Sequence, residues 1–360
     1  MSDFTFLLKE VERLRSAGQT FAVGTVVNIA GSTYRQAGGR MLVREDLSTW
    51  GLISGGCLEE EIAREAEAVL QTGRPVVQSY DMTGPDDRLG FNTGCNGRVD
   101  VLITRDSPAL THLEAAVRQR TGGVLVQMVS GEIAPGSPDW ITVDDLASLR
   151  TDQALQREVR KVLRQQRTTL FRQPHRSLLL EYVRPPIHLL IFGTGADVDP
   201  LVKIAALLGW TVTLVGHRPK PWLQEHFPSA HHHVFLMHPE AVGEHISTDG
   251  RTVAVIMNHN LDRDRTLTRE LLNSAIPYVG LLGPRARFRE IAQTALEASI
   301  ETAALDRLYG PAGLDTGAES PEEIALSMAA EILSVTNRRP ATHLREGSGP
   351  IHNLCTTGSQ

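Results

Sequence analysis

The stretch that decides the fold is IHLLIFGTGADVDPLVKIAALLGWTVTLVG, residues 187–216. Its first six residues form a short apolar run, typical of a strand that is buried on both faces of a parallel sheet. A glycine-rich turn, GTG (193–195), leads into a helical pattern and then into a second strand, TVTLV (211–215). The two prolines just before this stretch, at 185–186, cannot continue a helix. A new domain is therefore expected to begin there.

Strand and helix patterns continue to alternate downstream. TVAVIM (252–257) and YVGLL (278–282) are expected to form strands, and helices are expected near RTLTRELLNSA (265–275) and after Pro321. Such alternation predicts a Rossmann-like, doubly wound parallel sheet, which we assign to residues 185–337. The remaining residues, 338–360, are rich in glycine, serine, threonine and proline and predict a flexible tail.

The part before the two prolines mixes strands and helices without a clear βαβ repeat. Residues 1–184 are therefore expected to form a mixed α+β domain, so that the whole chain is of the α/β class. Helices are predicted over 4–14 and 58–70, and strands over 21–29, 39–43, 49–53 and 98–103.

Composition narrows the functional classes. The chain has 360 residues, 41% of them hydrophobic and 22% charged, which suits two globular domains. A net charge of −6 does not favour binding to nucleic acid or to an anionic membrane surface. The sequence has no stretch of about 18 apolar residues that would predict a membrane span. Three cysteines are too few for a disulfide scaffold. We expect a cytoplasmic protein with small-molecule or protein partners.

Cys57 has an unusual setting. It follows Ser54, Gly55 and Gly56 and immediately precedes a predicted helix. The N–H groups of a first helical turn and the helix dipole favour thiolate over thiol, and paired glycines allow an anion to approach the backbone. A small buried thiol is the alternative interpretation, because glutamates follow directly and oppose ionisation if they point toward the sulfur.

The glycine-rich turn and the strand ends predict a ligand crevice. Gly193 and Gly195 stand where a Rossmann domain binds phosphate, but Gly216 occupies the place of the acid that usually holds a ribose hydroxyl. Arg218 suits the additional phosphate of NADP. The alternative is that the crevice has a Rossmann structure and binds no dinucleotide. Further polar groups follow the carboxyl ends of other strands and are expected to share this crevice: Asn258-His259-Asn260, Gly283-Pro284-Arg285 and Arg287.

Six blocks of sequence resemble the XdhC/CoxI family, the maturation factors of xanthine dehydrogenase and related molybdenum hydroxylases. They follow the order of the family along the chain: GSTYRQAGGRMLV (31–43), SGGCLE (54–59), GCNGRVDVLI (94–103), FGTGADVDPLVKIAALLGW (192–210), YVGLLGPRARF (278–288) and GPAGLDTGAESPEEIALSMAAEI (310–332). The resemblance implies a cytoplasmic, homodimeric chaperone more than a catalyst. It would bind molybdenum cofactor, protect its sulfurated form and deliver it to an apo-hydroxylase, in cooperation with a cysteine desulfurase.

This resemblance implies roles for particular residues. The cofactor is a pterin dithiolene with a terminal phosphate, so Cys57 is the expected soft contact to molybdenum and Cys95 a helper. Arg35 and Arg40, in the glycine-rich loop 31–40, are expected either to cradle an anion or to be solvated loop charges. Cys95 departs from the family, since Asn96 replaces the first glycine of the usual CGG run. Two alternatives stay open: an NAD(P)-dependent oxidoreductase, and a sulfurtransferase that carries a persulfide on Cys57.

Overall fold

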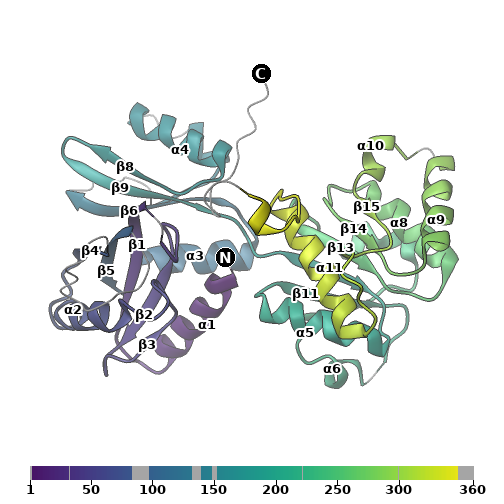
Figure 1. Ribbon diagram of the computed structural model, residues 1–360, viewed down its shortest axis with the longest axis horizontal. Helices are drawn as coiled ribbons and strands as arrows, with labels where there is room; N and C mark the ends of the chain where they lie inside the picture. Colours follow the sequence, from purple (N-terminus) through teal and green to yellow (C-terminus); the bar gives the residue numbers. More distant parts are fainter. Residues whose placement is uncertain are drawn as a thin grey trace. The chain divides into compact units, whose positions relative to one another are not determined.

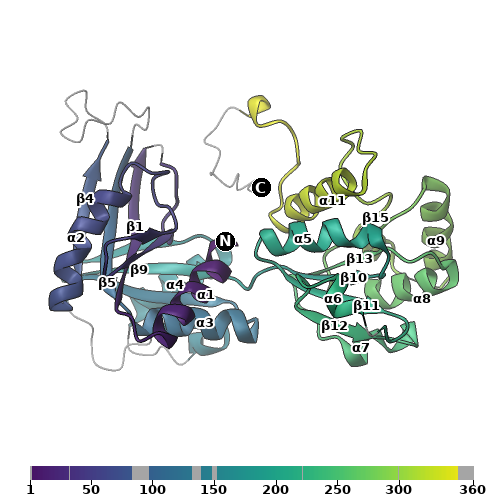
Figure 2. The same ribbon diagram turned by 90° about the horizontal axis from the view of Figure 1, so that it is seen from below.

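The computed structural model describes residues 2–31, 33–82, 97–131, 139–147, 152–220, 222–298 and 300–347. The chain forms two compact units, the first ending at Pro185 and the second beginning at Pro186 (Figure 1 and Figure 2). Among the described residues, no helix is both long enough and apolar enough to cross a lipid bilayer.

The first unit contains an antiparallel five-stranded sheet in the order β3-β2-β1-β5-β4. Its strands are β1 (Phe21–Gly31), β2 (Arg40–Arg44), β3 (Thr49–Trp50), β4 (Val76–Asp81) and β5 (Gly97–Arg105). Helix α2 (Glu59–Thr72) packs its apolar side chains on β1 and β5. The predicted strand over 49–53 is shorter than expected because the chain turns at Gly51, whose φ is +85°. The next residues form the loop that carries Cys57.

A second antiparallel sheet of the first unit has the order β7-β6-β9-β8. Its strands are β6 (Gly123–Gly131), β7 (Trp140–Ile141), β8 (Thr169–Gln173) and β9 (Arg176–Val183). Helix α4 (Gln153–Gln165) contacts β6 and β9, and α3 (Pro108–Gln119) contacts β6. Apolar residues of α1 (Ser2–Ser16), α3, and both sheets share one core, so the two sheets belong to the same unit.

The second unit is the predicted doubly wound sheet. Its six strands are all parallel, in the order β12-β11-β10-β13-β14-β15. They span β10 (His188–Phe192), β11 (Thr211–Gly216), β12 (His232–Phe235), β13 (Thr252–Ile256), β14 (Val279–Leu281) and β15 (Leu308–Tyr309). The chain starts at β10, proceeds outward to β12, then returns to the middle at β13. Strand order therefore reverses between β10 and β13, the position where such sheets bind ligands.

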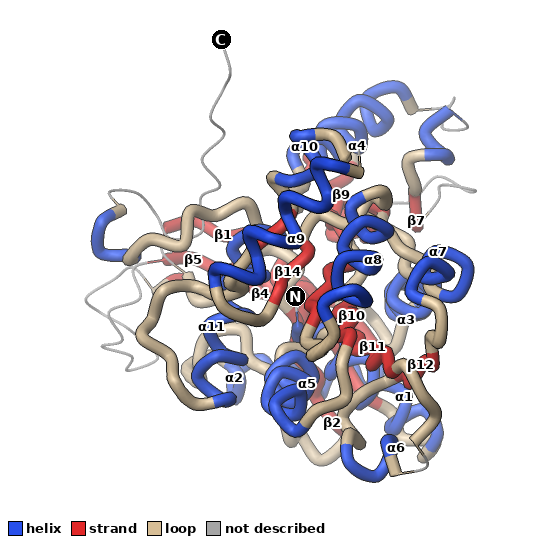
Figure 3. The backbone as a smooth tube through the Cα atoms, turned by 90° about the vertical axis from the view of Figure 1, so that its right-hand side faces the viewer, coloured by secondary structure: helices blue, strands red, loops and turns tan. Residues whose placement is uncertain are grey.

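Helices cover both faces of the parallel sheet. Helices α5 (Asp199–Leu207) and α11 (Pro321–Thr336) pack together on one face, and α8 (Leu261–Leu272) and α9 (Arg285–Glu297) on the other (Figure 3). Short helices complete the unit: α6 (Leu223–His226), α7 (Val242–His245) and α10 (Thr302–Leu305). The four central strands, β10, β11, β13 and β14, are buried almost along their whole length. This double burial explains why their sequences are continuous apolar runs.

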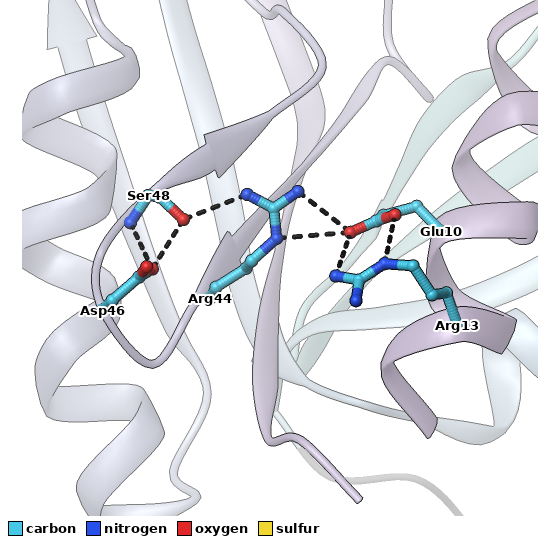
Figure 4. A network of polar contacts seen from close by, with 5 residues as sticks. All are labelled: Glu10, Arg13, Arg44, Asp46 and Ser48. Carbon is cyan, nitrogen blue, oxygen red and sulfur yellow. Dashed lines mark hydrogen bonds and ion pairs between the residues drawn. The ribbon is translucent and has the colours of Figure 1, made fainter. Parts of the chain in front are cut away.

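A polar network fastens α1 to the turn between β2 and β3 (Figure 4). The carboxylate of Glu10 accepts hydrogen bonds from Arg13 at 2.9 and 2.8 Å and from Arg44 at 3.2 and 2.9 Å. Arg44 also donates to Ser48 Oγ at 3.0 Å, and Ser48 donates to Asp46. The hydrogen bonds from Arg13 outweigh partial burial and, with those from Arg44, lower the pKa of Glu10 to about 2.

We expect Glu10→Gln to lower the free energy of unfolding at pH 7 by about 1 kcal/mol, the scale of a partly exposed charge network. The carboxylate has a lower pKa in the folded state, so its contribution is present at neutral pH and is lost as the pH falls from about 4.5 toward about 2. Urea titrations at pH 7 and pH 3 measure this. A difference from wild type that is equal at both pH values contradicts the expectation, and Glu12→Gln, exposed on the same helix, is the control.

Candidate functional site

A cavity of about 690 Å³ lies at the carboxyl ends of the parallel strands, where the strand order reverses. Its walls come from the segments that follow β10, β11 and β13, together with Pro239 and the first turns of α8. The lining residues are Gly193, Thr194, Gly195, His217, Arg218, Lys220, Pro239, Met257, Asn258, His259, Asn260, Asp262, Arg263 and Thr266. The structure therefore brings together six residues that the sequence singled out for a ligand: Gly193, Gly195, Arg218, Asn258, His259 and Asn260.

Gly193 allows the two central strand ends to approach closely. Its φ is +150°, and a Cβ atom there would lie 2.7 Å from the carbonyl oxygen of Met257. Any side chain at this position would push apart the turn after β10 and the segment after β13. The glycine thus shapes the floor of the cavity.

Three cations line the cavity: Arg218, Lys220 and Arg263. Arg218 is exposed. Lys220 Nζ donates to Thr194 Oγ1 at 2.8 Å, and Arg263 is fixed by hydrogen bonds to the carbonyl oxygens of Leu236 and Met237. These bonds hold two of the positive charges in place along the cavity wall.

The pKa of His217 reports the positive potential in the cavity. Burial lowers this pKa, and the charges of Arg263, Arg218 and Lys220 lower it further. The lining carboxylate of Asp262 is bound by Arg265 at 2.8 Å. The cavity is therefore an electropositive site suited to an anionic group.

An ion pair between Arg287 and the buried Asp264 supports a segment that lines the cavity. Arg287, on α9, donates to the carbonyl oxygen of Asn258 at 2.9 Å and to the carboxylate of Asp264. Asp264 is only 1% exposed, and burial raises its pKa although Arg287 acts in the opposite direction. Arg287 thus holds the segment after β13 in place.

The sequence predicted that Arg285 lines the cavity, and the structure places it elsewhere. It is the first residue of α9, its side chain is exposed, and neither it nor Gly283 and Pro284 is among the lining residues. The strand before it, β14, lies one position farther from the reversal of strand order than β13 does. This distance explains the difference from the sequence prediction.

The loop that carries Cys57 is organised around the side chain of Glu59. One carboxylate oxygen accepts from the N–H groups of Ile53 and Ser54, each at 2.8 Å. The other accepts from Ser54 Oγ at 2.6 Å and from the N–H groups of Gly56 and Leu58 at 3.0 and 3.2 Å. Glu59 is the first residue of α2 and is 6% exposed. A carboxylate of the chain itself therefore occupies this cluster of donors.

This arrangement changes the interpretation of Cys57. Its N–H group donates to Ser54 Oγ at 3.0 Å, so that the loop donors are engaged by Ser54 and Glu59. The glycines before it adopt φ values of +85° and +113°, which favour glycine at positions 55 and 56. Cys57 itself is half-buried with a free thiol. The N–H groups of residues 53, 54 and 56–58 are thus engaged within the loop by Ser54 and Glu59.

Two further glutamates near the thiol are also engaged. Glu60 and Glu61 both form ion pairs with Arg64, at 2.7 and 3.0 Å. Burial alone would raise the pKa of Glu59, but the hydrogen bonds from Ser54 and from the N–H of Ile53 outweigh it and lower that pKa. Glu59 is therefore held as a carboxylate within the loop.

We expect Glu59→Gln to lower the free energy of unfolding at pH 7 by about 1–3 kcal/mol, because an amide nitrogen cannot accept from the loop N–H groups. The pKa of Glu59 is lowered in the folded state, so the difference from wild type should shrink as the pH falls below its ordinary value. Urea denaturation measures the effect. Glu60→Gln is the matched control, since Glu60 is 82% exposed. Equal effects of the two substitutions would refute the role of Glu59.

Arg35 lies beside the Cys57 loop. Its Nε donates to the carbonyl oxygen of Leu52 at 3.0 Å. The ring of the neighbouring Tyr34 packs on Gly55, with Cδ2 at 3.5 Å from the position of a Cβ there. Tyr34 remains 56% exposed. These contacts join the two loops on one surface.

Arg40 is neither an anion cradle nor a solvated loop charge, so both expectations are corrected. It lies on β2, and its guanidinium is bound by the carboxylate of Glu181, on β9, at 2.7 and 2.6 Å. It also donates to the carbonyl oxygen of Gly38 and to Gln127. The two charged side chains are 1% and 2% exposed. Arg40 is therefore a structural residue that joins the two sheets.

The expectation for Cys95 falls outside the described residues, as does its neighbour Asn96. Cys355, in the predicted tail, falls outside them as well.

Comparison with known proteins adds an independent observation. Residues 189–332 match the XdhC Rossmann domain, and residues 14–81 match the XdhC and CoxI family. The chain belongs to the XdhC/CoxI family. The cation-lined cavity lies within the part that matches the family's Rossmann domain, and the Cys57 loop lies within the part that matches the N-terminal region.

Several proteins resemble this XdhC/CoxI chain over most of its length. A probable xanthine dehydrogenase subunit of Bacillus subtilis (strain 168) is 28% identical over 88% of this chain and 93% of its own. The molybdenum cofactor insertion chaperone PaoD of Escherichia coli (strain K12) is 24% identical over 92% and 88%. A crystal structure described as a xanthine dehydrogenase from Bacillus halodurans covers 93% of this chain and 96% of that one, with a TM-score of 0.72 and 26% identity.

Sequence reasoning missed two cations of this family member's cavity, Lys220 and Arg263. A signal for Lys220 was present, since it follows Arg218 in the segment after a central strand. Arg263 was harder to identify because it lies within α8, three residues after the helix cap Asn260. Only the fold shows that this first turn faces the cavity.

Proposed function

We propose that this chain binds molybdenum cofactor and delivers it to a xanthine dehydrogenase-type molybdoenzyme. The observation that carries the proposal is the electropositive cavity at the switch point of an XdhC Rossmann domain. The names of the relatives point the same way, since one is called a molybdenum cofactor insertion chaperone and another is named for xanthine dehydrogenase. Protection of a sulfurated cofactor, a cysteine desulfurase as sulfur source, a homodimer and a cytoplasmic location are parts of the same proposal.

The cavity fits the cargo in size and in charge. Its volume of about 690 Å³ lies within the range of small-ligand pockets. The cofactor ends in a phosphate, and the guanidinium of Arg218 and the ammonium of Lys220 are groups that bind phosphate strongly. Arg263 is already oriented by two carbonyl oxygens, so little side-chain entropy is lost when an anion binds beside it.

The first unit contributes a separate proposed contact. Molybdenum is bound by sulfur in the cofactor, and a cysteine thiolate is the soft ligand type that suits such a centre. Cys57 is half-buried on a loop held by Glu59, so its position is fixed before any cargo arrives. We assign to Cys57 a contact with the molybdenum centre. We assign to Arg35, which lies beside the Cys57 loop, the binding of an anionic group of the cofactor.

No covalent step is required of the chain in this role. In the second unit, Arg218 and Lys220 bind a phosphate, and Arg287 and Asp264 hold the segment after β13 in position. In the first unit, Cys57 supplies a separate soft contact. Release follows when the acceptor enzyme binds the cargo more tightly. The residues described therefore suit a carrier.

Purification from two hosts tests the proposal. Protein from a cofactor-producing host should contain molybdenum and oxidisable pterin in comparable amounts, and protein from a host unable to make the pterin should contain neither. Arg218→Ala should reduce the bound pterin by about tenfold, the effect of losing one charged hydrogen-bonding partner. Arg289→Ala, exposed on α9, is the matched control. Absence of pterin from the wild-type protein made in the first host would overturn the proposal.

One observation favours a second candidate, an NAD(P)-dependent oxidoreductase. The strand order and the turn at Gly193 are those of dinucleotide-binding domains. However, a Cβ atom at Gly216 would lie 3.2 Å from Thr194 Cγ2 and 3.6 Å from Phe235 Cδ1, so the ribose-binding acid has little room. Calorimetric titration with NAD, NADP and their reduced forms decides between the two functions. Tight binding with turnover supports the oxidoreductase.

The free thiol of Cys57 is the observation that favours a third candidate function, a sulfurtransferase that carries a persulfide on this residue. Mass spectrometry after incubation with a cysteine desulfurase and cysteine measures sulfur addition at Cys57. A stable adduct that is transferred to an acceptor supports this candidate, and its absence supports the carrier.

A further inference from the structure

Trp222 is an exposed tryptophan next to a short helix that is anchored in the core. It directly precedes α6, and 39% of its surface is exposed. Leu223 and Phe227, which follow it, are buried in the core of the second unit. The rings of Trp222 and His226 lie 4.6 Å apart. The indole is therefore held in position although it is partly exposed.

The ring of Trp222 contacts the ammonium of Lys220, which lines the cavity. Lys220 Nζ lies 4.9 Å from the centroid of the ring, within the range of a cation–π interaction. The same ammonium donates to Thr194 Oγ1, in the glycine-rich turn, at 2.8 Å. Trp222 itself is not among the residues that line the cavity. Its effect on a bound ligand is therefore expected to pass through Lys220.

These two contacts restrict a side chain that is otherwise among the most flexible. Lysine has a long side chain, and fixing it when a ligand binds costs conformational entropy. An ammonium has three N–H donors, of which Thr194 accepts one. Burial, and then nearby positive charges that include Lys220, lower the pKa of His217, another lining residue. The charge of Lys220 thus acts within the cavity.

We propose that Trp222 is a positioning residue of the anion site: its ring holds the ammonium of Lys220 at the glycine-rich turn, where it donates to a phosphate. Arg263 is oriented in a comparable way by the carbonyl oxygens of two residues that follow β12. Two of the three cations that line the cavity are then fixed before an anion binds. This inference rests on the proposed function in one respect, that a phosphate binds in this cavity.

Calorimetric titration with inorganic phosphate tests this role on protein from a host that is unable to make the pterin. We expect Trp222→Leu to weaken phosphate binding about two- to tenfold, the effect of having to immobilise one long side chain on binding. Trp222→Phe keeps an aromatic ring and should stay closer to wild type. Gln224→Leu, exposed on the same helix, is the matched control and should bind phosphate as wild type does.

A double-mutant cycle separates positioning from a general structural effect. Lys220→Met should weaken phosphate binding about tenfold, the effect of losing a charged hydrogen-bond donor. In that background Trp222→Leu should cause no further loss, because no ammonium is left to position. An equal loss in both backgrounds, an unchanged phosphate affinity of Trp222→Leu, or absence of phosphate binding by wild type would overturn the proposal.

Pterin content of wild type and Trp222→Leu from a cofactor-producing host keeps this result separate from the proposed function. If the cycle shows the expected coupling and wild type holds no pterin, the positioning role stands and the proposed function fails. If wild type holds pterin and Trp222→Leu binds phosphate as wild type does, the proposed function stands and the positioning role is wrong.

Discussion

Replacing Glu181 with leucine should lower the free energy of unfolding by about 3–5 kcal/mol, the cost of breaking a buried ion pair by removing one partner. The substitution leaves the guanidinium of Arg40 with no countercharge from Glu181, in a position where its side chain is 1% exposed. Glu181 lies on β9 and Arg40 on β2, so the pair links the two sheets of the first unit. Its loss should destabilise the packing between them.

A double-mutant cycle measures this effect. Urea titrations of Glu181→Leu, Arg40→Met and the double variant give the three changes in the free energy of unfolding. The double variant should lose much less than the sum of the single variants, because it leaves no unpaired buried charge. Strict additivity, or a loss below about 1 kcal/mol for Glu181→Leu, the range of exposed pairs, would contradict the structural role of Arg40.

Replacing Cys57 with alanine should lower the molybdenum content of the purified protein by about tenfold or more, the effect of losing one strong ligand contact. The physical reason is the position of the thiol. Glu59 and Ser54 fix the loop around it, so that the sulfur is presented with little conformational freedom. The alanine variant keeps this loop and removes only the sulfur.

Metal analysis and pterin fluorescence of proteins purified side by side measure the effect. Cys355→Ala is the matched control, since Cys355 lies in the predicted tail. The urea midpoint of Cys57→Ala should stay close to wild type, which separates loss of cargo from loss of folding. If Cys57→Ala retained as much molybdenum and pterin as wild type, the proposed contact would be wrong.

The sequence predicts the second unit well because its signals are local. Each central strand is a continuous apolar run, and the turn at Gly193 lies between a strand and a helix in sequence as in space. Helix α2 begins at Glu59, one residue after its predicted start. These features depend on neighbours along the chain, which a periodic pattern records.

Other features depend on contacts between distant residues. Arg40 is 141 residues away from Glu181, and nothing near Arg40 in the sequence indicates a buried partner. Strands β8 and β9 were not among the strands predicted for the first unit. They form by pairing with each other and, for β9, with the distant β6.

Maturation of a xanthine dehydrogenase-type apo-hydroxylase measures whether this chain carries molybdenum cofactor to an acceptor enzyme. Sulfur-loaded cofactor is supplied at a fixed concentration, and hydroxylase activity is followed with and without this protein. We expect faster and more complete activation in the presence of this protein, and a reduced effect with Arg218→Ala and Cys57→Ala. Activation at the same rate and to the same extent with and without this protein would contradict the proposed function.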